Sequence, residues 1–251
     1  MSTKEGKFKN LKLLFFMLSA FFLLTGITTI TAAFGATVTG KVVKADGTTG
    51  VADVEVDFYD PAINASVGNV STDTDGNFNI TLADGDYNVS LYDMPSNVNE
   101  APPVGMTISI TGSTFTFKGG NGSSTPQTAS PVTIKLKTGT RISGKVVKAD
   151  GTTGVSNAWV DFYDRNANST AGGIDADASG NFSIALADGD YNVNVSNIPS
   201  NVDEAPPAGM TISITGSTFS FKGGNGSSTP QTASPVTIKL KTGTRISGKV
   251  V

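Results

Sequence analysis

Gly40-Lys-Val-Val-Lys-Ala-Asp-Gly-Thr-Thr-Gly50 decides how this chain is organised, because the stretch recurs. The same eleven residues return at 144–154, 104 residues later, and the first four recur at 248–251. Aligning 40–143 with 144–247 leaves 26 differences and 78 identical positions. A repeat this long can enclose its own core, so it predicts tandem domains and not solenoid units that borrow a neighbour's surface.

The period divides the chain into four parts. We expect a signal peptide at 1–35, a first β-domain (copy 1) at 36–139, a second (copy 2) at 140–243 and the start of a truncated third copy at 244–251. The three residues 138–140 link the copies and reach roughly 10 Å. If the chain enters and leaves each copy at opposite ends, so short a link stacks successive copies end to end with little contact.

The first 35 residues have the pattern of an export signal. A lysine-rich start, from Lys4 to Lys12, precedes an apolar run at 13–24, and small residues place cleavage after Gly35. An extracellular or cell-surface protein is therefore predicted. An uncleaved membrane anchor is the alternative, because the uncharged run 13–36 is long enough to span a bilayer.

Composition excludes several functional classes. The formal net charge is −3, which argues against a nucleic-acid partner, because phosphate backbones are bound by basic patches. The chain has no cysteine and no histidine, so disulfides, histidine-based zinc sites and Ser-His-Asp triads are unavailable. We expect membrane contact only through the leader or through an anchor beyond residue 251.

Apolar and polar residues alternate with period two along both copies, which is typical of half-buried strands. In the strand at 53–59 we expect Val54, Val56 and Phe58 to point inward, and Glu55, Asp57 and Tyr59 outward. Further strands are predicted, in copy 1, at 37–44, 69–73, 77–82, 87–91, 106–110, 115–117 and 132–136. Many short strands without helical periodicity predict an all-β chain of tandem antiparallel β-sandwich domains.

Residues 38–92 resemble the carboxypeptidase regulatory-like family. The resemblance lies in Gly40-Lys-Val-Val with Asp46-Gly47, in Gly50-Val51, in Thr72-Asp-Thr-Asp-Gly-Asn-Phe78 and in Ala83-Asp-Gly-Asp-Tyr87-Asn-Val89. It implies a transthyretin-like or Ig-like sandwich. It implies no activity, because such domains accompany enzymes, adhesins and receptors without being catalytic themselves. Residues 95–130 depart from the compact family pattern.

Several motifs that could carry chemistry have simpler structural explanations. Asp73-Thr-Asp75-Gly76 resembles an oxygen-ligand calcium loop, but copy 2 has Ser179 in place of Asp75, so a polar turn is preferred. A Lys–Asn isopeptide bond from Lys41 or Lys44 to Asn88, assisted by Glu55, is disfavoured because Trp159 replaces that acid. The Gly-rich stretch 119–130 lacks the lysine of a phosphate-binding loop and is expected to be mobile.

No catalytic, cofactor or metal site is predicted. The carboxylates of Asp57, Asp60, Asp84 and Asp86 fall on turns or on a solvent face, without an apolar pocket to separate their pKa values. Nine Asn-x-Ser/Thr sequons could accept N-linked glycans if the source cell has the machinery. The nine asparagines are Asn64, Asn69, Asn79, Asn88, Asn121, Asn168, Asn181, Asn194 and Asn225.

The sequence favours a non-catalytic, exported repeat protein that acts as a stalk or spacer. An adhesin, binding a carbohydrate or a protein partner of the surface or matrix, is the alternative, as is an accessory domain of a larger extracellular hydrolase. Only three positions of 96–143 differ between copies, whereas the other differences cluster at 52–75 and 90–95. The near-invariant part could be a shared contact face or the mark of recent duplication.

Overall fold

The computed structural model describes residues 35–243, so the predicted signal peptide and the start of a third copy lie outside the described residues. Every regular element between 35 and 243 is a β-strand, which confirms the predicted all-β class. Within that range no helix is long and apolar enough to cross a membrane.

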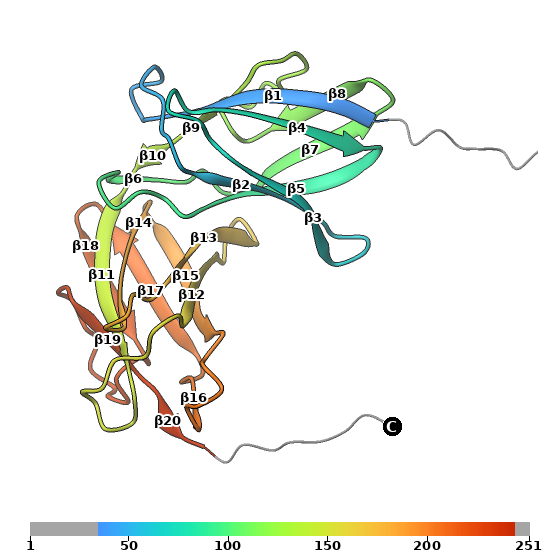
Figure 1. The fold of residues 1–251 in the computed structure, drawn as a ribbon. Helices are drawn as coiled ribbons and strands as arrows, with labels where there is room; N and C mark the ends of the chain where they lie inside the picture. The colour runs from blue at the N-terminus through green and yellow to red at the C-terminus, as the bar shows by residue number, and fades with distance from the viewer. Residues whose placement is uncertain (1–34, 244–251) are drawn as a thin grey trace, which may run out of the picture. The chain divides into compact units, whose positions relative to one another are not determined.

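Copy 1 is a sandwich of two sheets (Figure 1). A three-stranded sheet has the order β4-β1-β9, a five-stranded sheet has the order β3-β2-β5-β7-β8, and β6 pairs with β10. The strands are β1 (Gly35–Val43), β2 (Glu55–Asp60), β3 (Ala65–Ser71), β4 (Asn77–Ala83), β5 (Gly85–Tyr92), β6 (Glu100–Ala101), β7 (Met106–Thr111), β8 (Thr114–Lys118), β9 (Val132–Lys135) and β10 (Lys137–Thr138).

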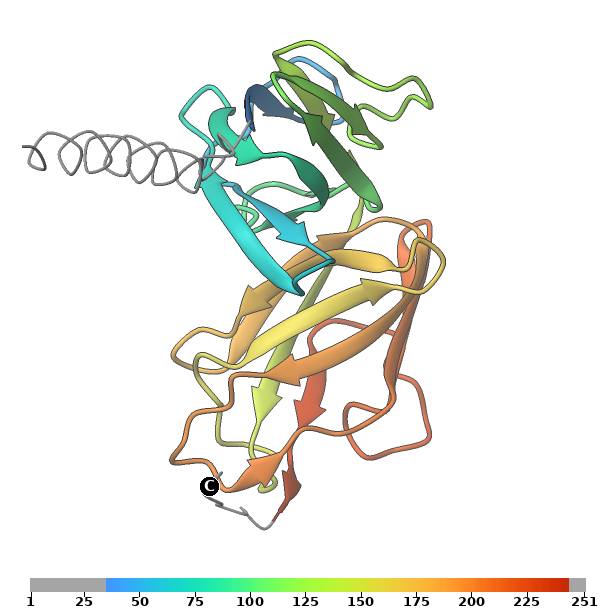
Figure 2. The ribbon, with the colours of Figure 1, turned by 90° about the vertical axis from the view of Figure 1, so that its right-hand side faces the viewer.

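Copy 2 repeats this arrangement strand for strand. Its sheets have the orders β14-β11-β19 and β13-β12-β15-β17-β18, and β16 pairs with β20; Figure 2 shows the larger sheet in yellow to orange. The strands are β11 (Thr140–Val147), β12 (Trp159–Asp164), β13 (Ser169–Asp175), β14 (Asn181–Leu186), β15 (Gly189–Ser196), β16 (Glu204–Ala205), β17 (Met210–Thr215), β18 (Thr218–Lys222), β19 (Val236–Lys239) and β20 (Lys241–Thr242).

The strand alternation places one apolar face of each sheet in the core. Val54, Val56 and Phe58 are at most 1% exposed, as predicted. Asp57, which was expected to face solvent, is only 9% exposed, so that prediction is wrong. Its carboxylate accepts a hydrogen bond from the Ser66 hydroxyl and borders the contact with copy 2.

One strand pair departs from the predicted antiparallel sandwich. β1 pairs with β4 antiparallel but with β9 parallel, with Gly40 opposite Val132. The parallel pairing arises because β9 reaches this sheet by a crossover from β8 in the other sheet, and parallel neighbours need such a crossover instead of a hairpin.

The recurring stretch brings β1 close to β4, its neighbour in the same sheet. A Cβ on Gly40 would lie 2.2 Å from the Phe78 ring, and one on Gly50 would lie 1.9 Å from the carbonyl oxygen of Asp75. Between these glycines the Asp46 carboxylate accepts hydrogen bonds from Thr48 and Thr49, which close the turn. The stretch therefore allows β1 to pack against β4 and against the turn that precedes it.

The Gly-rich loop at 119–130 is tied to the sandwich. Gln127 exchanges two backbone hydrogen bonds of 2.8 Å with Phe117. Its side-chain amide bonds both the amide and the carbonyl of Thr133. Gly120 accepts a bond from the Lys135 amide. The expected mobility is therefore limited to the segment between these anchors.

Copy 1 should fold without copy 2, because its core cluster contains only its own residues, from Ala36 to Leu136. Residues 36–139 expressed alone are expected to give a β-rich circular dichroism spectrum and one cooperative melt. A chain of 36–139 that becomes ordered only in tandem with copy 2 would show that the boundary at Gly139 is misplaced.

Candidate functional site: the junction between the copies

The residues that join the copies are fixed on both sides. Lys137 and Thr138 pair with β6 of copy 1, and the Thr140 hydroxyl donates a 2.5 Å hydrogen bond to the carbonyl of Gly216 in copy 2. Gly139 lies so close to copy 1 that a Cβ would stand 3.0 Å from the Cβ of Ala101. The link is thus a packed part of the structure.

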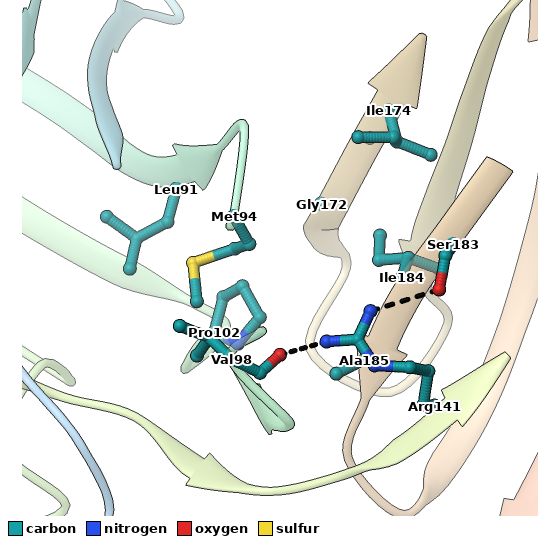
Figure 3. Close-up of a pocket in the computed structure, with 11 residues that line it drawn as sticks. Leu91, Met94, Val98, Pro102, Arg141, Gly172, Ile174, Ser183, Ile184 and Ala185 are labelled. Atoms are coloured by element: carbon teal, nitrogen blue, oxygen red, sulfur yellow. Dashed lines mark hydrogen bonds between the residues drawn. The ribbon is translucent and has the colours of Figure 1, made fainter. Parts of the chain in front are cut away.

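Arg141 carries the polar part of the junction (Figure 3). Its guanidinium donates to the backbone carbonyl of Val98 and to Asn99 Oδ1 (2.8 Å) in copy 1. A further bond, of 3.0 Å, reaches the Ser183 hydroxyl in copy 2. Copy 1 has Thr37 at the place of Arg141, so this clamp exists only where one copy follows another.

Apolar side chains surround the clamp. Leu91, Met94 and Pro102 of copy 1 face Ile174 and Ile184 of copy 2. The cavity left between them is about 10 Å³, no more than a single water needs. Leu91 and Pro102 approach the backbone of copy 2 closely; a Cβ on Gly172 there would lie 3.7 Å from the Leu91 carbonyl oxygen. The expectation of little contact between the copies is therefore wrong.

An aromatic contact closes one side of the junction. The rings of Tyr92 and Trp159 have centroids 5.7 Å apart and are tilted by 57°. Trp159 lies across Gly173, where a Cβ would come within 2.3 Å of the indole. In copy 1 the same two places hold Glu55 and Asn69, which hydrogen-bond each other. The exchange of the acid for tryptophan therefore required the exchange of asparagine for glycine.

Some of the differences between the copies lie at this junction. We call the side of copy 1 that contacts copy 2 its tail face, and the side of copy 2 that contacts copy 1 its head face. The tail face consists of Leu91, Tyr92, Met94, Val98 and Pro102, with Val104 packed against the core of copy 2; the head face consists of Trp159, Gly172, Gly173, Ile174, Ile184 and Ala185.

Eight of the 26 differences between the copies fall on these two faces. Positions 90–94 and 104 differ in copy 2, where they have no following described copy to contact. Positions 55, 69, 70 and 81 differ in copy 1, which contacts no preceding copy within residues 35–243. The differences at these positions are visible in the sequence. From the sequence alone, however, they cannot be distinguished from random substitution of exposed residues. Part of the junction, including Val98, Pro102 and Arg141, lies within the near-invariant 96–143.

A polar cleft of about 480 Å³ opens beside the aromatic contact. Tyr59 and Tyr92 line it from copy 1, and Tyr163 lines it from copy 2. Burial raises the pKa of Tyr92, and the carboxylates of Asp161 and Asp57 raise it further. Burial also raises the pKa of Asp161 to about 6. The junction therefore holds two ionisable side chains, Tyr92 and Asp161, that are both partly buried.

The motif at Asp73 is a turn cap in both copies. The Asp73 carboxylate accepts hydrogen bonds from the amides of Asp75 and Asn77 and from the Asn77 side chain. Asp177 makes the same bonds in copy 2, although Ser179 replaces the second acid. These bonds, led by that from the Asn77 amide, lower the pKa of Asp73. Residues 35–243 contain no group of three or more Asp, Glu, His or Cys side chains that could hold a metal ion.

Removal of calcium should therefore leave the fold unchanged. A chelator is expected not to move the melting temperature, whereas Asp73→Ala should lower that of copy 1, because the turn loses its cap. The matched variant is Asp75→Ala, which mimics Ser179 and should be close to neutral. A chelator-dependent fall in melting temperature would assign these turns to a cation.

The other predicted candidates are not brought together. Lys41 and Lys44 belong to or follow β1, whereas Asn88 lies on β5 in the opposite sheet. Asp60 and Asp84 cap turns, through the amides of Ala62 and Gly112.

The sequon asparagines are accessible to different degrees. Asn121 and Asn225 are partly exposed, and Asn88 and Asn168 border the cleft between the copies. The other five are exposed, on β3, β4, β14, β15 and a turn: Asn64, Asn69, Asn79, Asn181 and Asn194.

No family model and no curated protein matches this chain. Among solved structures, the Bacillus anthracis TIE protein is 19% identical over 65% of this chain and 29% of its own, with a TM-score of 0.27. The Streptococcal ancillary pilin is 14% identical over 86% and 64%, with a TM-score of 0.28. Shaft pilin spaA from Lactobacillus rhamnosus GG is 11% identical over 85% and 100%, at 0.29. The chain thus spans less than two thirds of the first two, and TM-scores this low carry no argument about its function.

Proposed function

We propose that this chain is a non-catalytic, exported repeat protein that acts as a spacer at the cell surface, built from carboxypeptidase regulatory-like sandwiches. The observation that carries the proposal is the junction. A spacer must keep a fixed geometry between its domains, and here the two copies are joined by a hydrogen-bonded clamp with almost no void. A flexible tether would need none of these contacts.

The differences between the copies support a mechanical role. Trp159, Gly173 and Arg141 have replaced Glu55, Asn69 and Thr37 together, and each of the three touches the other copy or makes room for a residue that does. Random substitution of solvent-exposed residues would not produce such matched exchanges, whereas selection for a fixed geometry between the domains would produce them.

The family resemblance is supported by contacts among the residues that carry it. The Tyr87 hydroxyl donates a 2.9 Å bond to the carbonyl of Ala83, closing the last hairpin of the motif. Gly40 meets Phe78, and Gly50 meets the turn before it. The motif thus forms one packed unit within each copy, and export follows from the leader predicted at 1–35.

A distance measurement between the copies tests the spacer. The chain has no cysteine, so single cysteines at the exposed positions Thr107 and Thr218 can be spin-labelled specifically. A narrow distance distribution is expected for the parent chain. Arg141→Thr should broaden it at least about twofold, because losing hydrogen bonds worth about 1–2 kcal/mol weakens the docking roughly 5- to 30-fold.

Lys222→Thr is the matched control, because it also removes one positive charge but from an exposed site on β18. It should leave the distribution narrow. If the parent chain gives a broad distribution, or if the control broadens it as much as the clamp variant does, the copies are not held at a fixed geometry and the spacer role fails.

A further inference from the structure

The polar cleft beside the aromatic contact has the size of a small-molecule site. Its volume of about 480 Å³ falls within the roughly 300–1,000 Å³ that is usual for such sites. We call it the junction cleft, and both copies line it. Its residues are Asp57, Tyr59, Asn88, Ser90 and Tyr92 of copy 1, and Tyr163, Asn168, Ser169 and Thr170 of copy 2.

The copy 1 side of the junction cleft is formed by two inner strands of a sheet. β2 and β5 are neighbours, with Asp57 opposite Ser90 and Tyr59 opposite Asn88. Each strand also pairs with a further strand on its other side, so most of its backbone groups are used in the sheet. A peptide that binds by adding a strand needs free backbone groups. Side chains therefore have to recognise a ligand on this surface.

Asp57 is a buried acid with an oxygen to spare. It is 9% exposed, and its Oδ1 accepts the hydrogen bond from Ser66. No residue of 35–243 donates a hydrogen bond to Oδ2, and no sealed polar side-chain atom of these residues lacks a partner, so Oδ2 is reachable from the cleft. A carboxylate oxygen that is held largely out of water is a strong acceptor for a ligand hydroxyl.

Further polar groups of the cleft are available for a ligand. Within residues 35–243 the side chains of Asn88, Asn168 and Tyr163 form no hydrogen bond with another side chain or with the backbone. An amide and a phenol each both donate and accept. A ligand that satisfies them together with Asp57 must carry several groups that donate and accept, as alcohol hydroxyls do.

Charge and aromatic surface narrow the ligand further. No lysine or arginine is among the residues of 35–243 that line the cleft, and Asp57 repels anions. Tyr59, Tyr92 and Tyr163 supply aromatic surface, against which an apolar C–H face packs. A quaternary ammonium ion would suit the tyrosines and the carboxylate, but it would leave the asparagine amides unpaired. A sugar ring offers both an apolar face and a rim of hydroxyls.

We propose that the junction cleft binds an uncharged oligosaccharide. Its hydroxyls bond to Asp57 Oδ2 and to the amides of Asn88 and Asn168, and its ring faces lie against the tyrosines. This binding goes beyond the spacer role. It rests on the same junction, because each copy contributes one side of the cleft.

Trp159 provides a built-in reporter of occupancy. It is the lone tryptophan, and its ring lies 5.7 Å from that of Tyr92, which lines the cleft. The probes are maltotriose, cellotriose and triacetylchitotriose, each added up to about 10 mM and followed by fluorescence and calorimetry. At least one of them should bind with a Kd of about 1 mM or tighter. Production in a host without N-glycosylation keeps Asn88 and Asn168 unmodified.

Asparagine variants test the two sides of the cleft. Asn88→Ala and Asn168→Gly should each weaken binding about fivefold, since each removes one hydrogen-bonding amide. Glycine suits position 168, where φ is 52°. Asn79→Ala is the matched control, because it removes the same amide from an exposed site on β4 in the other sheet, and its affinity should equal that of the parent. All three residues are exposed, so the melting curves should match the parent.

Tyrosine variants test the aromatic surface. Tyr59→Ala should weaken binding about tenfold, because the sugar loses a ring to pack against. Tyr59→Phe keeps the ring and should retain most of the affinity, since the Tyr59 hydroxyl is already used in its hydrogen bond to Asn64. Equal losses in the two variants would exclude packing on the ring.

Three outcomes would overturn the proposal. The first is that none of the three trisaccharides binds. The second is that Asn88→Ala and Asn168→Gly bind as the parent does, or that Asn79→Ala loses as much affinity as they do, which would place the sugar elsewhere. The third is tighter binding of tetramethylammonium or trigalacturonate than of every uncharged probe, which would assign the cleft to a charged ligand. A narrow distance distribution between the copies without sugar binding would remove this proposal alone and leave the spacer.

Discussion

Replacing Gly154 with alanine is expected to destabilise copy 2 by about 3 kcal/mol or more, among the largest effects of any single methyl group in the chain. The added Cβ would stand 1.9 Å from the carbonyl oxygen of Ser179 and 2.5 Å from its carbonyl carbon. Both atoms belong to the backbone of a turn that the Asp177 carboxylate caps, so they cannot move aside as a flexible side chain could.

The lone tryptophan makes the measurement specific to one copy. Trp159 lies in copy 2, so its fluorescence reports the unfolding of that copy. Gly154→Ala should move the fluorescence transition to lower denaturant concentration. Gly50→Ala, which places a methyl 1.9 Å from the Asp75 carbonyl, should destabilise copy 1 and move that transition far less.

Gly226→Ala is the matched control in the same copy. Gly226 has a φ of 76°, but no atom lies within 4 Å of its added Cβ. Its variant should cost only about 1 kcal/mol, the usual penalty for alanine at positive φ. Equal costs at Gly154 and Gly226 would show that the close approach of the recurring stretch to its turn does not contribute to the stability of copy 2.

The fold was predictable because its determinants are local. In each short segment of both copies, the alternation of apolar and polar residues identifies the strand and its buried face. The glycines of the recurring stretch identify the turns. The parallel pairing of β1 with β9 was not predictable in this way. It depends on a connection between sheets that no pattern within either strand encodes.

The junction was not predictable for a different reason. Trp159 in place of Glu55 indicates an outward face, and that part of the prediction holds. An outward residue can face water or another copy, and the alternation of apolar and polar residues is the same in both cases. Asp57 shows the consequence: its place in the alternation points away from the core, yet it is 9% exposed and lines a cleft together with residues of copy 2. A coupled exchange such as Asn69 for Gly173 can be explained only from the structure, in which the Trp159 indole lies across Gly173.

Asp161→Asn is expected to stabilise the protein at pH 7 by about 1–2 kcal/mol, and to have no such effect at pH 4 or below. Asp161 is half-buried on β12, opposite Gly173 and Asn194, and burial raises its pKa to about 6. Between the ordinary aspartate pKa near 4 and this value, the folded protein binds the proton and the unfolded chain does not. The contribution to stability is therefore complete below pH 4 and is lost as the pH rises through 6.

Chemical denaturation of both proteins from pH 4 to pH 8 measures this effect directly. The difference in unfolding free energy, variant minus parent, should rise with pH and level off above about 7. Asp188→Asn removes an exposed carboxylate from the same copy, and its curve should be flat. The contact with copy 1 supplies part of the burial, since Asp161 lies near enough to Tyr92 to raise the pKa of that phenol. Arg141→Thr should consequently lower the pKa of Asp161, as followed by carboxyl NMR shifts. A titration of Asp161 near 4 in the parent chain would mean that the junction leaves this acid in water, and that the copies are not packed as described.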